Sequence, residues 1–157
     1  MRELANRKWS FPAAVLSAGS TSTYTTGVTV NSINRGKYGT ALTNQTTQAT
    51  PTTDARTGAA FPVVPLNYGT VIVMGIVAAG TIVACQGTVT KLLSDTVFLV
   101  APEFPPLPED FVPIGYYVVK NGTGGGNWIF GTSYWNASGI TVTATSCSEL
   151  PDRPQIA

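Results

Sequence analysis

The chain has 157 residues, enough for one domain with a core of its own. Only 11% of the residues are charged and the net charge is +1, so no basic field would draw the protein to nucleic acid. The sequence has no histidine, which removes the commonest general base and the commonest metal ligand of proteins. A surface this poor in charge is solubilised by hydroxyl and amide groups or covered by other subunits.

Residues 1–20 show no periodic pattern, and we interpret them as an N-terminal arm. Basic residues precede a short apolar run there, but a proline and a serine interrupt the run, so we do not expect a secretory signal. Such an arm is either disordered or docked on a neighbouring subunit. Its candidate interface residues are Trp9 and Phe11.

Residues 21–58 are dominated by Thr, Ser, Asn, Gln and Gly. Tyr24, Val28, Val30 and Ile33 predict one or two exposed strands, because threonine, tyrosine and β-branched residues favour a sheet with one wet face. Residues 44–58 have almost no apolar content and are expected to form a long loop.

Residues 59–157 are predicted to form the core domain. Strands are expected over 70–77, 81–90 and 96–101, with turns at 78–80 and 92–95, which is the spacing of a meander. Residues 71–85 are apolar but shorter than the roughly 20 residues of a membrane-spanning helix, so we expect two core strands there and no membrane contact.

The region that follows contains five prolines over residues 102–113 and cannot be an interior strand. We expect an extended connector that lays Phe104, Leu107 and Phe111 over the core. Further strands are predicted over 114–120, 128–131 and 140–145, with a glycine-rich hairpin loop at 121–127 and an extended tail at 150–155. The predicted fold class is mainly β: an antiparallel sandwich or small barrel with an extended N-terminal arm and a proline-rich connector.

No catalytic, cofactor-binding or metal site is expected. Cys85 and Cys147 do not form a CxxC motif, which argues against zinc; we favour two buried thiols, although one disulfide is geometrically conceivable. Glu109 and Asp110 are adjacent, and neighbours in an extended chain point to opposite sides, so they do not form a carboxylate pair. The chain is therefore not expected to be an enzyme.

Four aromatic residues lie close together in the sequence: Trp128, Phe130, Tyr134 and Trp135. They suit a carbohydrate-stacking platform, but we favour a place in the core or in a subunit interface, where aromatic anchors are common. Arg153 either clamps a carboxylate of a neighbouring chain or belongs to a solvated tail.

Five segments between about Asn44 and Gln155 stand out: ATPTTDARTGAAF (49–61), the GTV and QGTV framing of 69–89, PEFPPLPEDFVPIGYYVVKNG (102–122), FGTSYWNASGITVT (130–143) and the closing LPDRPQ. Through these segments the sequence resembles small structural proteins of tailed phages, of the capsid decoration or cement type.

This resemblance implies an outer-surface virion protein, commonly a homotrimer. It would bind the major capsid protein over the junctions between capsid subunits and reinforce the shell against internal genome pressure. A second hypothesis is a tail or fibre module that binds host glycans through Tyr134 and Trp135 or through the 121–127 loop.

Overall fold

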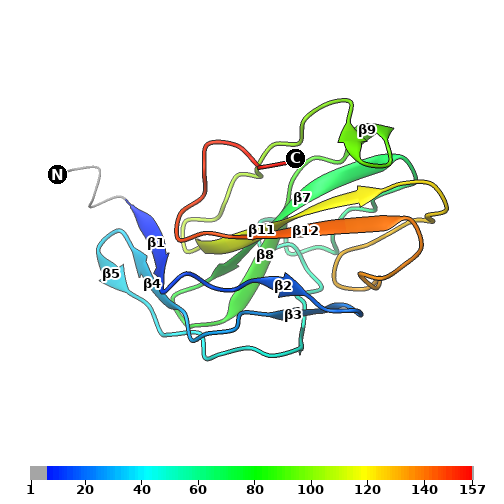
Figure 1. Cartoon of the computed structure of the whole chain (residues 1–157). Coiled ribbons are helices and arrows are strands. Elements are labelled where there is room, and N and C mark those ends of the chain that lie inside the picture. Colours follow the sequence, from blue (N-terminus) through cyan, green and yellow to red (C-terminus); the bar gives the residue numbers. More distant parts are fainter. Residues whose placement is uncertain (1–6, 157) are drawn as a thin grey trace.

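The computed structural model describes residues 7–156, and these residues contain twelve strands and no helix (Figure 1). All strand pairs are antiparallel, so the predicted mainly β antiparallel fold class is confirmed. The strands are β1 (Lys8–Phe11), β2 (Ser17–Ala18), β3 (Thr23–Thr25), β4 (Asn31–Asn34), β5 (Lys37–Tyr38), β6 (Gln48–Ala49), β7 (Tyr68–Ile76), β8 (Ile82–Gln86), β9 (Thr90–Ser94), β10 (Val97–Phe98), β11 (Val112–Asn121) and β12 (Ile140–Ser146).

A six-stranded sheet forms the centre of the molecule, in the order β10-β9-β7-β11-β12, with β8 also paired to β7. The paired strands β7 and β11 are buried almost throughout, as their near-continuous apolar sequences require. The two edge strands β10 and β12 lie at opposite sides of this sheet. The central pair therefore supplies the rigid floor on which the remaining segments pack.

Apolar residues pack on both faces of the central sheet. One face carries Ile72, Met74 and Tyr117 and lies under the larger core cluster, which includes most of the buried aromatic rings. The opposite face carries the smaller cluster of Val71, Val73, Cys85, Phe111, Tyr116 and Val118. Alternate residues of β7 and β11 serve the two clusters because successive side chains of a strand point to opposite faces.

Two small sheets cover the larger cluster and the end of the molecule next to it. Their strand orders are β1-β4-β5 and β2-β3-β6 (Figure 1). The segment at residues 8–18, which the sequence pattern assigns to an arm, contains β1 and β2 and packs on the rest of the chain. The reason is long-range pairing: the Ser10 amide donates to the Ser148 carbonyl at 3.0 Å, and the Leu16 amide donates to Ser146 Oγ at 2.7 Å.

Most of the strands predicted in the core domain are found, although the strand predicted at 81–90 ends at Gln86 and the one predicted at 96–101 is only Val97–Phe98. The turn at 78–80 is confirmed, with Gly80 at φ 78°. The predicted turn at 92–95 is wrong, because Leu92 packs inward within β9 and the chain turns only at 95–96. The strand predicted at 128–131 is reduced to one bridge between Val64 and Trp128, since the chain turns at Gly131, whose φ is 82°.

The proline-rich connector has no strand between residues 102 and 109, as predicted. Phe104 and Leu107 pack against the smaller cluster, and the Phe104 ring meets Tyr116 edge-on at 5.0 Å between centroids. Pro113, predicted to end the connector, belongs to β11, where the register with β7 shifts. No helix in the described residues has the length and hydropathy needed to cross a membrane.

Candidate interaction surface

A tight hairpin at one end of the molecule begins the candidate site. Arg35 (φ 53°) and Gly36 (φ 80°) join β4 to β5, with Asn34 opposite Lys37. Two consecutive positive φ angles are those of a type I′ turn, which matches the twist of a two-residue hairpin. This turn reverses the chain, so that β5, which carries Tyr38, pairs with β4.

An apolar row crosses the three strands of this small sheet. Trp9 is opposite Ile33, and Ile33 is opposite Tyr38, so the three side chains share one face. Phe11 is two residues after Trp9 on the same face and lies 5.6 Å from its ring and 6.4 Å from the ring of Tyr38, between centroids. Trp9 is 43% and Tyr38 76% exposed, so the two outer rings of this row face solvent, while Ile33 between them is buried.

The opposite face of the same sheet is polar and buried. Ser10 and Ser32 lie on it and are almost fully buried, and the hydroxyl of Ser10 donates to the Pro113 carbonyl of β11 at 3.1 Å. The usual arrangement is thus inverted: hydroxyl groups pack towards the body of the protein while aromatic rings face outwards. An exposed apolar face of this kind is a candidate interaction site.

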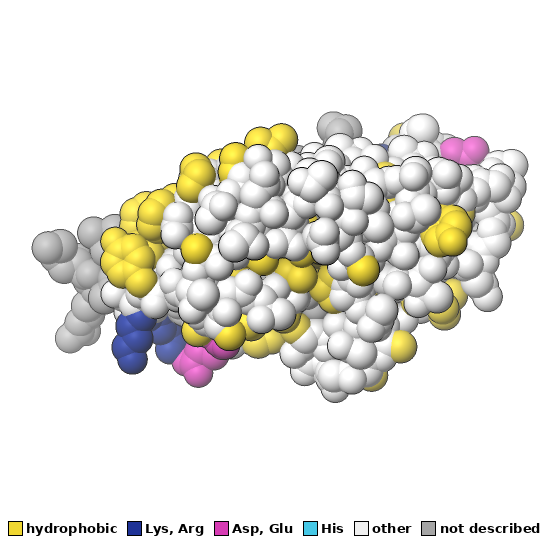
Figure 2. All heavy atoms as spheres, turned by 90° about the horizontal axis from the view of Figure 1, so that it is seen from below, with side chains coloured by type: hydrophobic (Ala, Val, Ile, Leu, Met, Phe, Trp, Pro, Cys, Tyr) yellow, Lys and Arg dark blue, Asp and Glu magenta, His cyan; other side chains and the backbone are white. Residues whose placement is uncertain are grey.

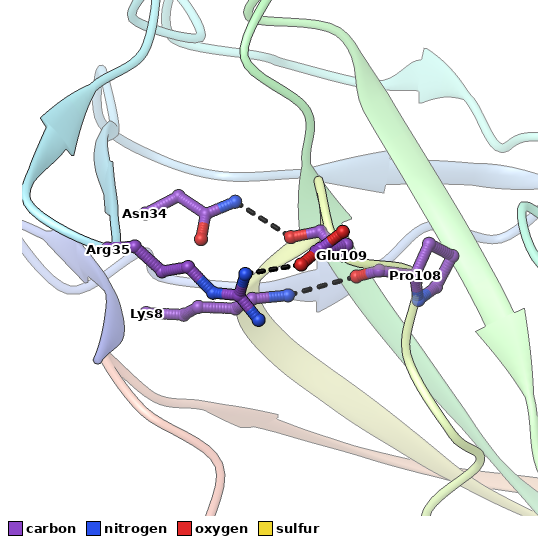
Figure 3. Close-up of polar contacts among 5 residues, drawn as sticks. All are labelled: Lys8, Asn34, Arg35, Pro108 and Glu109. Atoms are coloured by element: carbon purple, nitrogen blue, oxygen red, sulfur yellow. Dashed lines mark hydrogen bonds and ion pairs between the residues drawn. The ribbon is translucent and has the colours of Figure 1, made fainter. Parts of the chain in front are cut away.

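Polar contacts fix this sheet to the proline-rich connector (Figure 3). Lys8 Nζ donates to the Pro108 carbonyl at 3.0 Å, and Asn34 Nδ2 donates to the Glu109 carbonyl at 2.8 Å. The guanidinium of Arg35 pairs with the Glu109 carboxylate. Burial lowers the pKa of Lys8, and the nearby charge of Arg35 acts in the same direction.

A groove of about 470 Å³ lies beside the aromatic row. We call it the aromatic groove; its lining residues are Arg7, Trp9, Ile33, Gly36, Tyr38, Ser148 and Glu149. Arg7 and Glu149 form a bidentate ion pair, with Nε 2.5 Å from Oε1 and Nη2 2.7 Å from Oε2. This pair joins the segment before β1 to the segment after β12. Figure 2 shows hydrophobic side chains gathered at this end of the molecule beside side chains of both charges.

Of the interface residues predicted from the sequence, only Trp9 and Phe11 lie on the aromatic face of the small sheet. Phe104 and Leu107 are partly buried against the smaller cluster. Phe111 immediately precedes β11, is fully buried and packs against Gly75, so it presents no surface to a partner. These three residues hold the connector on the core, as the sequence pattern indicates.

The aromatic residues near 130 form a core cluster rather than a platform. Trp128, Phe130 and Trp135 are at most 4% exposed, and the Trp135 ring lies 5.2 Å from Trp128 and 4.7 Å from Tyr117, between centroids. The Trp135 indole donates to the Thr23 carbonyl at 2.9 Å. Tyr134 alone is exposed, at 56%, so a stacking surface shared by Tyr134 and Trp135 is not formed.

Arg153 is exposed on the C-terminal tail. It lines a shallow hollow of about 300 Å³ together with the connector residues Pro102, Glu103 and Phe104. The hollow lies over the smaller cluster and is separate in its lining from the aromatic groove.

The two thiols lie in surroundings that favour their protonated form. Cys85 and Cys147 are unbridged, and burial raises the pKa of each thiol to about 11, with Asp54 adding to the effect at Cys85. Within residues 7–156 no three His, Cys, Asp or Glu side chains are placed to hold a metal ion.

Sequence reasoning missed Tyr38 and Ile33 as members of the site. The available signal was the Asn34–Lys37 segment, in which Gly36 favours a two-residue turn and so predicts a return strand carrying Tyr38. The partner strand β1 had no such signal, because Ser10 occupies its inward face.

Comparison with protein-family models, with curated proteins and with solved structures gives no match. The interpretation of the site therefore depends on its own geometry.

Proposed function

We propose that this chain is a virion structural protein of the capsid decoration type, which binds the outer surface of a tailed-phage capsid and stabilises the shell. Its partner is the major capsid protein, and it acts as a homotrimer on particles assembled in the host cytoplasm. The observation that carries the proposal is the aromatic groove, with Trp9 and Tyr38 turned to solvent on an all-β scaffold of low charge.

The composition of the aromatic groove suits a contact with protein. Tryptophan, tyrosine and arginine dominate the binding energy of protein interfaces. Trp9 and Tyr38 supply two such rings, and the Arg7–Glu149 pair supplies a polar rim of the kind that surrounds an apolar interface centre. A decoration protein needs only modest affinity at each site, because several linked copies on one lattice bind with a high effective concentration.

The groove is also held in place before any partner arrives. The buried serine face fixes the small sheet to β11, and the Lys8, Asn34 and Arg35 contacts fix it to the connector. A surface ordered in advance loses less conformational entropy on binding. This rigidity supports a role in reinforcing a shell, where the bound protein has to resist deformation.

The proposal is tested by substituting Tyr38 with alanine and measuring binding to undecorated capsids by co-sedimentation. Because Tyr38 is 76% exposed, the fold should be retained, while capsid affinity should fall about 30-fold, the equivalent of roughly 2 kcal/mol for an interface anchor. Tyr134→Ala is the matched control, since it removes an exposed tyrosine outside the groove. Wild-type protein that fails to bind capsids, or a Tyr38→Ala variant that binds as well as the wild type, contradicts the proposal.

The same two variants test the glycan-binding alternative, which the exposure of Tyr134 favours. A tail or fibre module would bind sugars on a glycan array and lose that binding in Tyr134→Ala while Tyr38→Ala kept it. Sugar binding of this kind, without capsid binding, would contradict the decoration proposal and support the glycan-binding alternative.

A further inference from the structure

The edge strands of the central sheet differ in their length and in how far other segments cover them. The loop that contains Asp54 and Ala55 covers the outer edge of β8. The Ala55 amide donates to the Ala84 carbonyl at 2.8 Å, and the Gln86 amide donates to Asp54 Oδ2 at 3.0 Å. Strand β10 is only two residues long. Covering an edge and shortening it are two ways in which proteins prevent unwanted strand pairing.

Strand β12 is not shortened, and the described part of the chain covers it only at its last residue, where the Leu16 amide donates to Ser146 Oγ at 2.7 Å. It is seven residues long and pairs with β11 over its full length without a register shift. Its sequence, ITVTATS, contains no charged residue and no proline. Within residues 7–156 no strand other than β11 pairs with it. A long, regular and uncharged edge is a template for another strand.

The hydrogen-bond pattern identifies which backbone groups are free. The Gly122 amide donates to the Gly139 carbonyl at 2.8 Å, and the Cys147 amide donates to the Ile114 carbonyl at 3.1 Å. Hydrogen-bonded pairs alternate along an antiparallel ladder, so Thr141, Thr143 and Thr145 bond to β11. The N–H and C=O groups of Val142 and Ala144 therefore point away from β11, to the open edge.

We propose that β12 pairs antiparallel with β12 of a second copy of this chain, about a two-fold axis at Thr143. In this register Val142 is opposite Ala144 of the second copy, and each such pair exchanges both of its N–H···O=C bonds. The contact is self-complementary, as a two-fold interface requires, and no like charges meet because the strand has none.

The inference depends on the backbone of β12 and not on the capsid role. The contact joins two free chains, or one chain from each of two neighbouring homotrimers, in which case it links adjacent decoration units. The aromatic groove has no residue of β12 in its lining, so the two surfaces share no residue.

The register is tested by disulfide trapping with Thr143→Cys. Thr143 is exposed and would face itself across the axis as a non-hydrogen-bonded pair, with Cα atoms about 4.5 Å apart. This separation falls within the range that a disulfide spans. Mild oxidation should convert most of the variant to a covalent dimer on a non-reducing gel. Thr132→Cys, an exposed threonine in the preceding loop, is the matched control and should stay largely monomeric, as should the wild type, in which Cys85 is buried and Cys147 partly buried.

A second pair of variants makes the test specific for this register. Thr141→Cys would face Thr145 of the second copy, so alone it should cross-link at least tenfold less than Thr143→Cys, whereas the Thr141→Cys, Thr145→Cys double variant should cross-link efficiently. Equal cross-linking at 132 and 143 overturns the proposal, and so does the absence of any dimer from Thr143→Cys. In the wild type, slower hydrogen exchange at Val142 and Ala144 with rising concentration supports the pairing without any substitution, and concentration-independent exchange contradicts it.

Discussion

Replacing Asp54 with alanine should destabilise the protein far more than replacing any surface acid. Asp54 is the one charged side chain that is buried among the described residues, at 2% exposed. Its two oxygens accept bonds from the amides of Arg56 at 2.8 Å and Gln86 at 3.0 Å, and the second bond closes the edge of β8. Alanine removes both acceptors and leaves the Gln86 amide buried without a partner.

The size of the effect follows from these two contacts. Hydrogen bonds to a charged group contribute about 1.5–3 kcal/mol each, while the Arg56 amide regains part of its bond from water because that site is only partly buried. We therefore expect a loss of about 3 kcal/mol in the free energy of unfolding, measured by urea denaturation with an unchanged m-value.

Asp152→Ala serves as the control, because Asp152 lies on the exposed tail and should change stability by less than about 0.5 kcal/mol. A loss below about 1 kcal/mol for Asp54→Ala would refute the role of Asp54 in closing the β8 edge. The variant should also associate more readily than the wild type, since it opens a second strand edge.

Two further outcomes are expected. Trp135→Phe should lower the free energy of unfolding by about 1–2 kcal/mol and Trp135→Ala by about 3–5 kcal/mol in urea denaturation, because the ring is buried and its indole donates to Thr23; an unchanged stability in both would contradict the core role. Stability should fall between pH 9 and 12, since burial raises the pKa of Cys85 and Cys147 to about 11 and of Tyr24 to about 12, so the unfolded chain loses these protons first. The lowered pKa of Lys8 opposes this trend weakly. A urea midpoint that stays flat or rises between pH 9 and 12 would contradict the expected loss of stability.

The strands that could be predicted are those whose own sequence specifies them. Residues 70–77 and 114–120 are rich in β-branched and aromatic residues, and both lie in the buried central pair. The turn at Gly80 could be predicted for a similar reason, because glycine tolerates its positive φ. In these segments local preference and tertiary environment agree.

The features that could not be predicted depend on distant contacts. Residues 8–11 form a strand because they hydrogen-bond to Ser148 and β4, and no local sequence pattern predicts either partner. Phe111 and Trp135 carry the same aromatic signal as Trp9, and only the packing of the whole chain decides that the first two are buried while the third is exposed. Composition predicts that aromatic anchors exist, and topology determines which of them reach the surface.

The lining of the aromatic groove comes from both ends of the described chain, Arg7 and Trp9 on one side and Ser148 and Glu149 on the other. A chain that lacks either segment has only half of this surface. The groove is complete only when β1 docks beside Ser148, which follows the last strand of the central sheet. A fragment that ends before Ser148 would thus lack half of the proposed binding surface.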